Sequence, residues 1–139
     1  MKLLKQLLPL ALVLSLGTTV CRAEDTPMEK EMSAMNKAYK ALKKQIEDPS
    51  KKDENLKLIA EIKKTTETSS KMEPKTAKDQ PADKKAAYLE KFRAQMSDYL
   101  KAVNEVEAAV NAGNGAAAKA GLDKLNDLKK KGHEDFKKD

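Results

Sequence analysis

Residues 83–111 read DKKAAYLEKFRAQMSDYLKAVNEVEAAVN, and this stretch decides the fold. Its apolar side chains recur mostly at intervals of three and four residues, which places them along one face of an α-helix. The sequence NAGNG at 111–115 ends the pattern. A one-sided apolar face of this length needs other helices to cover it. The side chains on this face are Tyr88, Leu89, Phe92, Met96, Tyr99, Leu100, Val103, Val106 and Val110.

A second helical stretch begins at TPME, residues 26–29. Thr26 is suited to the N-cap position, Pro27 to the first helical position, and Glu29 to closing a capping box. We expect this helix to end near Pro49. Its apolar face consists of Met28, Met32, Met35, Tyr39, Leu42 and Ile46.

Two more helices complete the pattern. One is predicted over 51–72, with a weaker stripe, and is followed by a loop at 73–83, EPKTAKDQPAD. The other is predicted over 116–137. Because no β-rich run exists and the connections are short, we predict an all-α fold, an antiparallel up-down-up-down four-helix bundle. The apolar positions are Leu56, Ile59 and Ile62 in the weaker stretch and Ala118, Leu122, Leu125 and Phe136 in the last.

Residues 1–23 have the pattern of a secretory signal peptide, with early lysines, an apolar run from Leu7 to Leu16 and small residues up to Ala23. The apolar run is too short to span a membrane. We expect cleavage after Ala23 and an exported domain over 24–139 without a membrane-inserted segment. Lipid anchoring at Cys21 is the alternative.

The segment 24–139 contains no cysteine, which excludes disulfides and cysteine-attached cofactors. Removing Lys2, Lys5 and Arg22 from the 28 basic residues leaves 25 against 22 acidic residues, a net charge of +3. Arg93 is then the only arginine, and the lysines alternate with acidic residues. This pattern argues against a nucleic-acid partner, and the nearly balanced charge argues against a membrane-surface protein.

His133 is the only histidine. At 100° per residue it lies about 20° from Leu122 around the last helix, so we expect its ring to point inward. Met32 lies roughly 7.5 Å into the first helix and His133 roughly 9 Å from the chain end. In an antiparallel bundle they would face each other, as a thioether and an imidazole do in axial ligation of haem iron. A hydrogen-bonded core histidine and a gap-filling methionine would also fit this spacing.

Two segments resemble the cytochrome b562 family: MEKEMSAMNKAYKALKKQIED at 28–48 resembles its first helix, and LDKLNDLKKKGHEDF at 122–136 its last. The stretch from KFR at 91–93 through NAGNG to His133 is also similar. The resemblance implies a periplasmic protein with one non-covalent b-type haem per chain. The sequence KKKGH, which has lysines where a CxxCH motif has cysteines, agrees with non-covalent binding.

The resemblance also implies roles for individual residues. Met32 and His133 match the iron ligands, and Phe92 matches an aromatic that packs on the porphyrin. Met96 stands where the family has a second aromatic. In addition, Lys129 and Lys137 replace arginines near the haem edge, and Gly132 replaces a bulky aromatic.

The function implied is outer-sphere electron transfer by a monomer with redox partners that the sequence does not name, and not enzymatic catalysis. The alternative is a cofactor-free periplasmic helical bundle that acts as a binding or chaperone-like protein. In that case the pairing of Met32 with His133 would be a coincidence.

Overall fold

The computed structural model describes residues 25–137, which form four α-helices and no strand. The predicted all-α class is therefore confirmed, and each helix lies within a few residues of its predicted position. The signal peptide over 1–23, the cleavage after Ala23 and the alternative anchor at Cys21 fall outside the described residues. The elements are α1 (Pro27–Gln45), η1 (Pro49–Lys51), α2 (Lys52–Ser70), η2 (Lys75–Asp79), α3 (Ala82–Asn111) and α4 (Gly115–Phe136), where η denotes a 3₁₀ helix.

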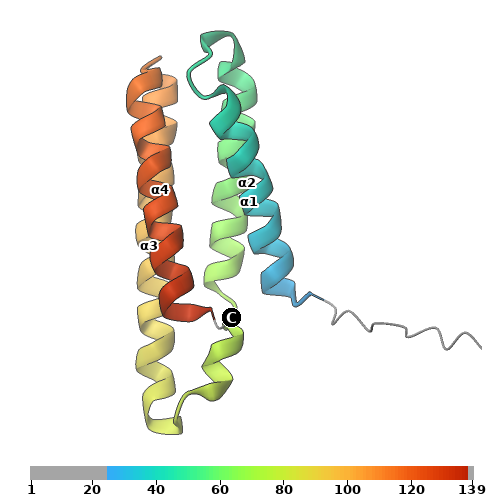
Figure 1. The fold of residues 1–139 in the computed structure, drawn as a ribbon, viewed down its shortest axis with the longest axis vertical. Helices are drawn as coiled ribbons and strands as arrows, with labels where there is room; N and C mark the ends of the chain where they lie inside the picture. Colours follow the sequence, from blue (N-terminus) through green and yellow to red (C-terminus); the bar gives the residue numbers. More distant parts are fainter. Residues whose placement is uncertain (1–24, 138–139) are drawn as a thin grey trace, which may run out of the picture.

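The four α-helices lie side by side as a bundle (Figure 1). Each packs on the next along the chain: α1 on α2, α2 on α3, and α3 on α4. The backbones of α1 and α4 approach each other less closely. None of the helices within 25–137 is long and apolar enough to cross a membrane.

The start of α1 is fixed by the predicted capping box. Thr26 Oγ1 accepts a hydrogen bond from the Glu29 amide at 3.3 Å, and the Thr26 amide donates to Glu29 Oε2 at 2.6 Å. These two bonds satisfy amide groups that the helix itself leaves free. Glu29 also accepts from Lys75 Nζ at 2.6 Å, which ties the start of α1 to η2.

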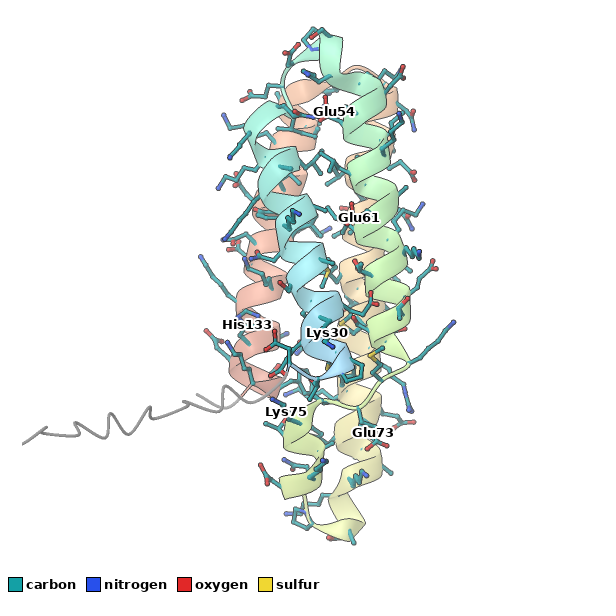
Figure 2. All side chains as sticks on the ribbon, turned by 90° about the vertical axis from the view of Figure 1, so that its right-hand side faces the viewer. Lys30, Glu54, Glu61, Glu73, Lys75 and His133 are labelled. Atoms are coloured by element: carbon teal, nitrogen blue, oxygen red, sulfur yellow. The ribbon has the colours of Figure 1, made fainter. Side chains whose placement is uncertain are left out.

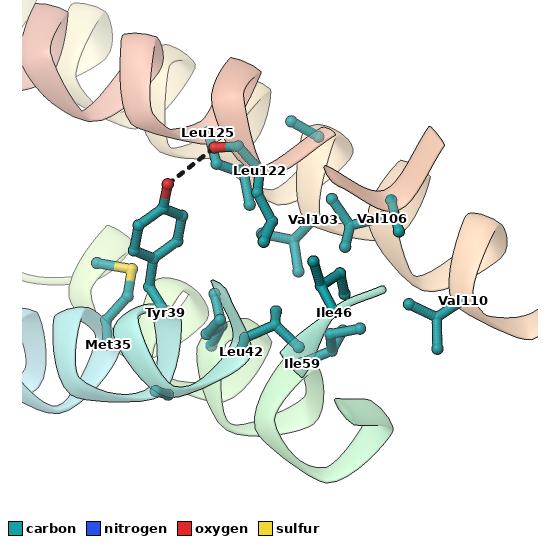
Figure 3. Packing of buried hydrophobic residues seen from close by; sticks show 14 of the residues in the cluster. Met35, Tyr39, Leu42, Ile46, Ile59, Val103, Val106, Val110, Leu122 and Leu125 are labelled. Carbon is teal, nitrogen blue, oxygen red and sulfur yellow. Dashed lines mark hydrogen bonds between the residues drawn. The ribbon is translucent and has the colours of Figure 1, made fainter. Parts of the chain in front are cut away.

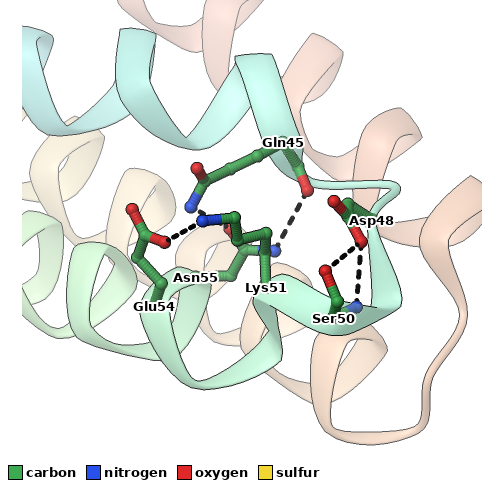
Figure 4. A network of polar contacts seen from close by, with 6 residues as sticks. All are labelled: Gln45, Asp48, Ser50, Lys51, Glu54 and Asn55. Carbon is green, nitrogen blue, oxygen red and sulfur yellow. Dashed lines mark hydrogen bonds and ion pairs between the residues drawn. The ribbon is translucent and has the colours of Figure 1, made fainter.

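The connection between α1 and α2 is a polar network (Figure 4). Gln45 Nε2 donates to Asn55 Oδ1 at 3.0 Å, and Asn55 Nδ2 donates to the Gln45 carbonyl at 3.3 Å. Asn55 is fully buried and is satisfied by these bonds. Between the helices, Asp48 caps η1 by accepting from the Ser50 amide at 2.9 Å. The end of α1 is thereby held against the start of α2.

The main core runs along the bundle axis and draws on all four helices (Figure 3). Across the wider seam between α1 and α4, the Tyr39 hydroxyl donates to the Leu122 carbonyl at 3.0 Å. The predicted apolar faces supply this cluster. Its buried members are Met35, Ala38, Tyr39, Leu42, Ile46, Ile59, Ile62, Tyr99, Ala102, Val103, Val106, Val110, Ala118, Leu122 and Leu125.

The weak apolar stripe of α2 has a structural reason. Its inner face buries the small polar residues Thr65, Thr66 and Ser69 next to Ile62. The Thr66 hydroxyl donates to the Ile62 carbonyl at 2.7 Å and contacts the Met35 sulfur at 3.3 Å. Because bonds of this kind satisfy hydroxyls within their own helix, threonines can enter a core without an apolar sequence signal.

The prediction of a loop over 73–83 is partly wrong. Residues Lys75–Asp79 form η2, and two of them, Thr76 and Ala77, are buried. Pro74 precedes this helix, and its fixed φ suits a helix start. The segment therefore packs against the end of the bundle instead of crossing it as an exposed linker.

Candidate functional site

A second, smaller apolar cluster lies apart from the main core, at the end of the bundle where α1 begins and α4 ends. Phe136 packs edge-on against Tyr88 and Phe92, with ring centroids 5.1 and 5.2 Å apart. The seam between α1 and α4 borders this cluster. Its buried members are Phe92, Met96 and Phe136, and Met28, Met32 and Tyr88 pack against them.

Met32 links the two clusters. Its side chain is half-buried and packs against both the main core and the smaller cluster. No other side chain among the described residues is placed against both clusters. The thioether thus sits at the boundary between a closed core and a more open end of the bundle.

His133 is exposed, so the prediction of an inward, buried ring is wrong. The predicted direction of His133 around the axis of α4 agrees with the structure, because Phe136 on the same side of α4 is buried at 8% exposure. The difference arises because Phe136 faces the closely packed α3, whereas the seam toward α1 is wider. In Figure 2, His133 lies on α4 at the same end of the bundle as Lys75.

Two contacts across the seam define the level at which Met32 and His133 stand. Lys129 Nζ donates to Asn36 Oδ1 at 3.4 Å. Met32 precedes Asn36 by one helical turn, and His133 follows Lys129 by one turn. Further along, Tyr39 bonds to the Leu122 carbonyl, so residue numbers fall along α1 as they rise along α4. The two contacts together indicate that Met32 and His133 lie near the same level of the seam.

The imidazole of His133 lies near two positive charges. Although the ring is largely exposed, desolvation on the side that faces the protein lowers the pKa of His133, and the charges of Lys137 and Lys129 lower it further. A lowered pKa favours the neutral ring, which has a nitrogen lone pair available for a metal.

Lys129 and Lys137 border the site on either side of His133. Lys129 is half-buried, and its Nζ lies 5.3 Å from the centre of the Tyr39 ring, a cation–π contact. Partial burial lowers the pKa of Lys129, with further contributions from nearby lysines such as Lys40. Lys137 is exposed at the C-cap of α4.

Phe92 and Met96, which the stripe of α3 predicted on its apolar face, are buried and lie in the smaller cluster. Met96 also lines a groove of about 470 Å³ between α2 and α3, together with Thr66, Arg93 and Leu100. Met96 is thus a shared wall between this groove and the cluster.

Phe136, Tyr88 and Met28 were predicted in apolar stripes but were not predicted to belong to the site. The position of Phe136 three residues after His133 was the available signal, because residues three apart share a helix face. Thr76 of η2 was missed altogether, since nothing in its loop segment indicated burial.

The donor set limits the kind of metal that this site suits. No group of three or more His, Cys, Asp or Glu side chains that could hold a metal ion occurs within residues 25–137. A thioether and an imidazole are too few to hold a bare ion, which takes about four ligands. They suffice for an iron whose other positions are filled by a macrocycle, as in haem. The residues present therefore fit haem.

A family model described as Cytochrome b562 matches residues 27–137, which include all four helices and every candidate site residue. No curated protein and no solved structure gives a significant match.

Proposed function

The chain belongs to the cytochrome b562 family, whose members bind b-type haem and carry electrons, and we propose that it does so as a soluble periplasmic protein. It binds one haem non-covalently, with Met32 and His133 as the axial ligands. The observation that supports this proposal is the pair of contacts between α1 and α4, which indicate one level of the seam for Met32 and His133, with Met32 packed against the smaller apolar cluster.

The chain's own residues supply three kinds of contact in this proposal. Met32 offers a soft thioether and His133 a neutral imidazole. Phe92, Met96 and Phe136 offer an apolar wall that excludes water from one side. Lys129 would attract a propionate as a point charge, without the bidentate geometry of arginine.

Bound haem supplies one-electron exchange between Fe(II) and Fe(III). A haem held by both Met32 and His133 would leave no position open to a substrate, so we propose an electron carrier and not an enzyme. The thioether of Met32 favours reduced iron and raises the potential. Its half-buried position limits the access of water to that ligand.

The proposal requires the antiparallel up-down-up-down order, and several contacts support it. The end of α1 is bonded to the start of α2 through Gln45 and Asn55. Lys52 Nζ, at the start of α2, donates to the Asn111 carbonyl at the end of α3 at 2.9 Å. Near the start of α3, Lys91 pairs with Asp135 at the end of α4 at 2.9 Å.

The last part of the proposal concerns export. We propose that residues 1–23 are removed after Ala23, so that the mature chain begins at Glu24 and acts as a periplasmic monomer. The intact mass of the protein recovered from the periplasm decides this. A mass that matches a lipidated chain beginning at Cys21 would overturn the soluble assignment.

A haemin titration tests the proposed function. Purified protein should bind one haemin per chain and show sharp α and β bands after reduction. Met32→Ala should still bind haem, through His133 and the apolar wall, but with a high-spin or water-ligated iron and a lower potential. His133→Ala should lose far more affinity. A wild-type protein that does not bind haemin, or a His133→Ala variant with the wild-type spectrum, would contradict the proposal.

A further inference from the structure

The last turn of α4, which carries His133, is held by hydroxyl groups from outside the helix. Carbonyls in the last turn of a helix have no partner within it. Here the Phe136 carbonyl accepts from Thr76 Oγ1 of η2 at 2.8 Å. The Tyr88 hydroxyl of α3 lies 2.5 Å from Thr76 Oγ1 and 3.4 Å from the Asp135 carbonyl.

The direction of these bonds follows from counting protons. The Thr76 hydroxyl has one proton, and the carbonyl of Phe136 can only accept it. Tyr88 then donates to Thr76 Oγ1, and its single proton is shared with the more distant Asp135 carbonyl. The result is a relay from α3 through η2 to the end of α4, in which each bond polarises the next.

The side chains of the same turn are held as well. The Asp135 carboxylate pairs with Lys91 Nζ at 2.9 Å and accepts a hydrogen bond from Gln95 Nε2, one turn further along α3. The Phe136 ring stands edge-on between Tyr88 and Phe92. Backbone and side-chain contacts thus both fix this turn to α3.

His133 itself has no comparable support. No described residue forms a hydrogen bond with its ring nitrogens, and the ring is exposed. Histidines that bind metals usually donate their second N–H to a protein group, which fixes the orientation of the ring. For His133, the placement of the imidazole therefore depends on the placement of the turn.

We propose that Thr76 and Tyr88 are positioning residues: their hydroxyl relay holds the last turn of α4 so that His133 can ligate the haem iron. Thr76, Tyr88 and Asp135 together are termed the C-terminal clamp. This inference rests on the proposed function, because one of its tests measures how firmly haem is held. It assigns to η2 and α3 a role that the ligands alone do not reveal.

The test compares Thr76→Val and Tyr88→Phe, which remove the hydroxyls and keep the shapes, with Thr76→Ser, which keeps the hydroxyl. Transfer of haem to an excess of apomyoglobin reports how firmly the haem is held. Removing either hydroxyl should speed transfer about tenfold or more, the usual effect of losing a group that orients a metal ligand. Thr76→Ser should restore a nearly wild-type rate.

Asn114→Ala is the matched control, because it removes the N-cap bond at the far end of the same helix, from the Ala117 amide to Asn114 Oδ1 at 3.0 Å. It should leave the transfer rate within about twofold of wild type, since it does not touch the clamp. Wild-type rates in both Thr76→Val and Tyr88→Phe, with haem bound, would overturn the clamp and leave the proposed function intact.

A haem-free measurement separates the two proposals. His133 is the only histidine, so the apoprotein gives one set of imidazole resonances by NMR. The two hydroxyl-deleted variants should shift or broaden that set, whereas Asn114→Ala should not. Unchanged resonances in both would contradict the clamp, even in a protein that takes up no haem; failure of the wild type to bind haem would contradict the proposed function.

Discussion

Gly121→Ala tests how closely α3 and α4 pack, and Gly132→Ala in the same helix is its matched control. A β-carbon on Gly121 would stand 2.6 Å from Cγ2 of Val106, whereas one on Gly132 would meet only Oε1 of Gln95, at 3.6 Å. Val106 is 1% exposed. Because a β-branched side chain has one strongly preferred rotamer in a helix, Val106 cannot turn away from the new methyl group.

The magnitudes decide the sign of each change. Alanine is favoured over glycine inside a helix by about 1 kcal/mol, so Gly132→Ala should raise the free energy of unfolding by about that amount. Gly121→Ala gains the same preference, but overpacking a filled core costs about 1–3 kcal/mol. The net change for Gly121→Ala is then between about zero and a loss of about 2 kcal/mol. The two variants should differ by about 1–3 kcal/mol.

Urea denaturation of the apoprotein, followed by circular dichroism, measures both changes. Gly121→Ala should also be tolerated better in a Val106→Ala background than in the wild type, since the smaller residue makes room, and the double-mutant cycle gives that coupling. If Gly121→Ala were as stable as Gly132→Ala, the close contact between Gly121 and Val106 would not exist in solution.

Three further predictions concern the seam, the start of α1 and the cofactor. Tyr39→Phe should lower the free energy of unfolding by about 1 kcal/mol, because the buried bond to the Leu122 carbonyl is lost; an unchanged urea midpoint would argue against that bond. Hydrogen bonding to Lys75, and then to Thr26, lowers the pKa of Glu29 from 4.5 to about 2, so its contribution is complete above pH 4.5 and is lost as the pH falls toward 2. The stability difference between wild type and Glu29→Gln should therefore shrink over that range, and a difference independent of pH would refute the ion pair. Haemin should raise the melting temperature of the helical apoprotein by several degrees, since a ligand that binds only the folded state stabilises it; identical melts would show that the cofactor is no part of the fold.

Local sequence signals predicted the helices well because they act within a few residues. The TPME stretch specified the capping box at Thr26 through residues three apart. The apolar stripe of 83–111 identified the buried face of α3, including Val103, Val106 and Val110, because that face is covered along its length. The same periodicity was weak in α2, whose buried threonines are satisfied by their own backbone.

The candidate site was less predictable because it depends on distances between helices. The helical periodicity gives the direction in which His133 points from the axis of α4, but it does not give the distance from α4 to α1. The ring is therefore exposed although Phe136, near it on the helix, is buried. The role of Thr76 depends on contacts with residues 12 and 60 positions away, Tyr88 and Phe136, which no local pattern encodes.

The proposed haem site is tested most directly by the identity of the axial ligands in the ferric haem complex. Near-infrared magnetic circular dichroism distinguishes thioether–imidazole ligation from other pairs. The wild type should show the thioether–imidazole signature, and Met32→Leu should lose it. Met35→Leu should keep it, because Met35 lies one turn away within the main core, in contact with Thr66. A wild-type complex without that signature, or its loss in Met35→Leu but not in Met32→Leu, would contradict the assignment of Met32 and His133 as ligands.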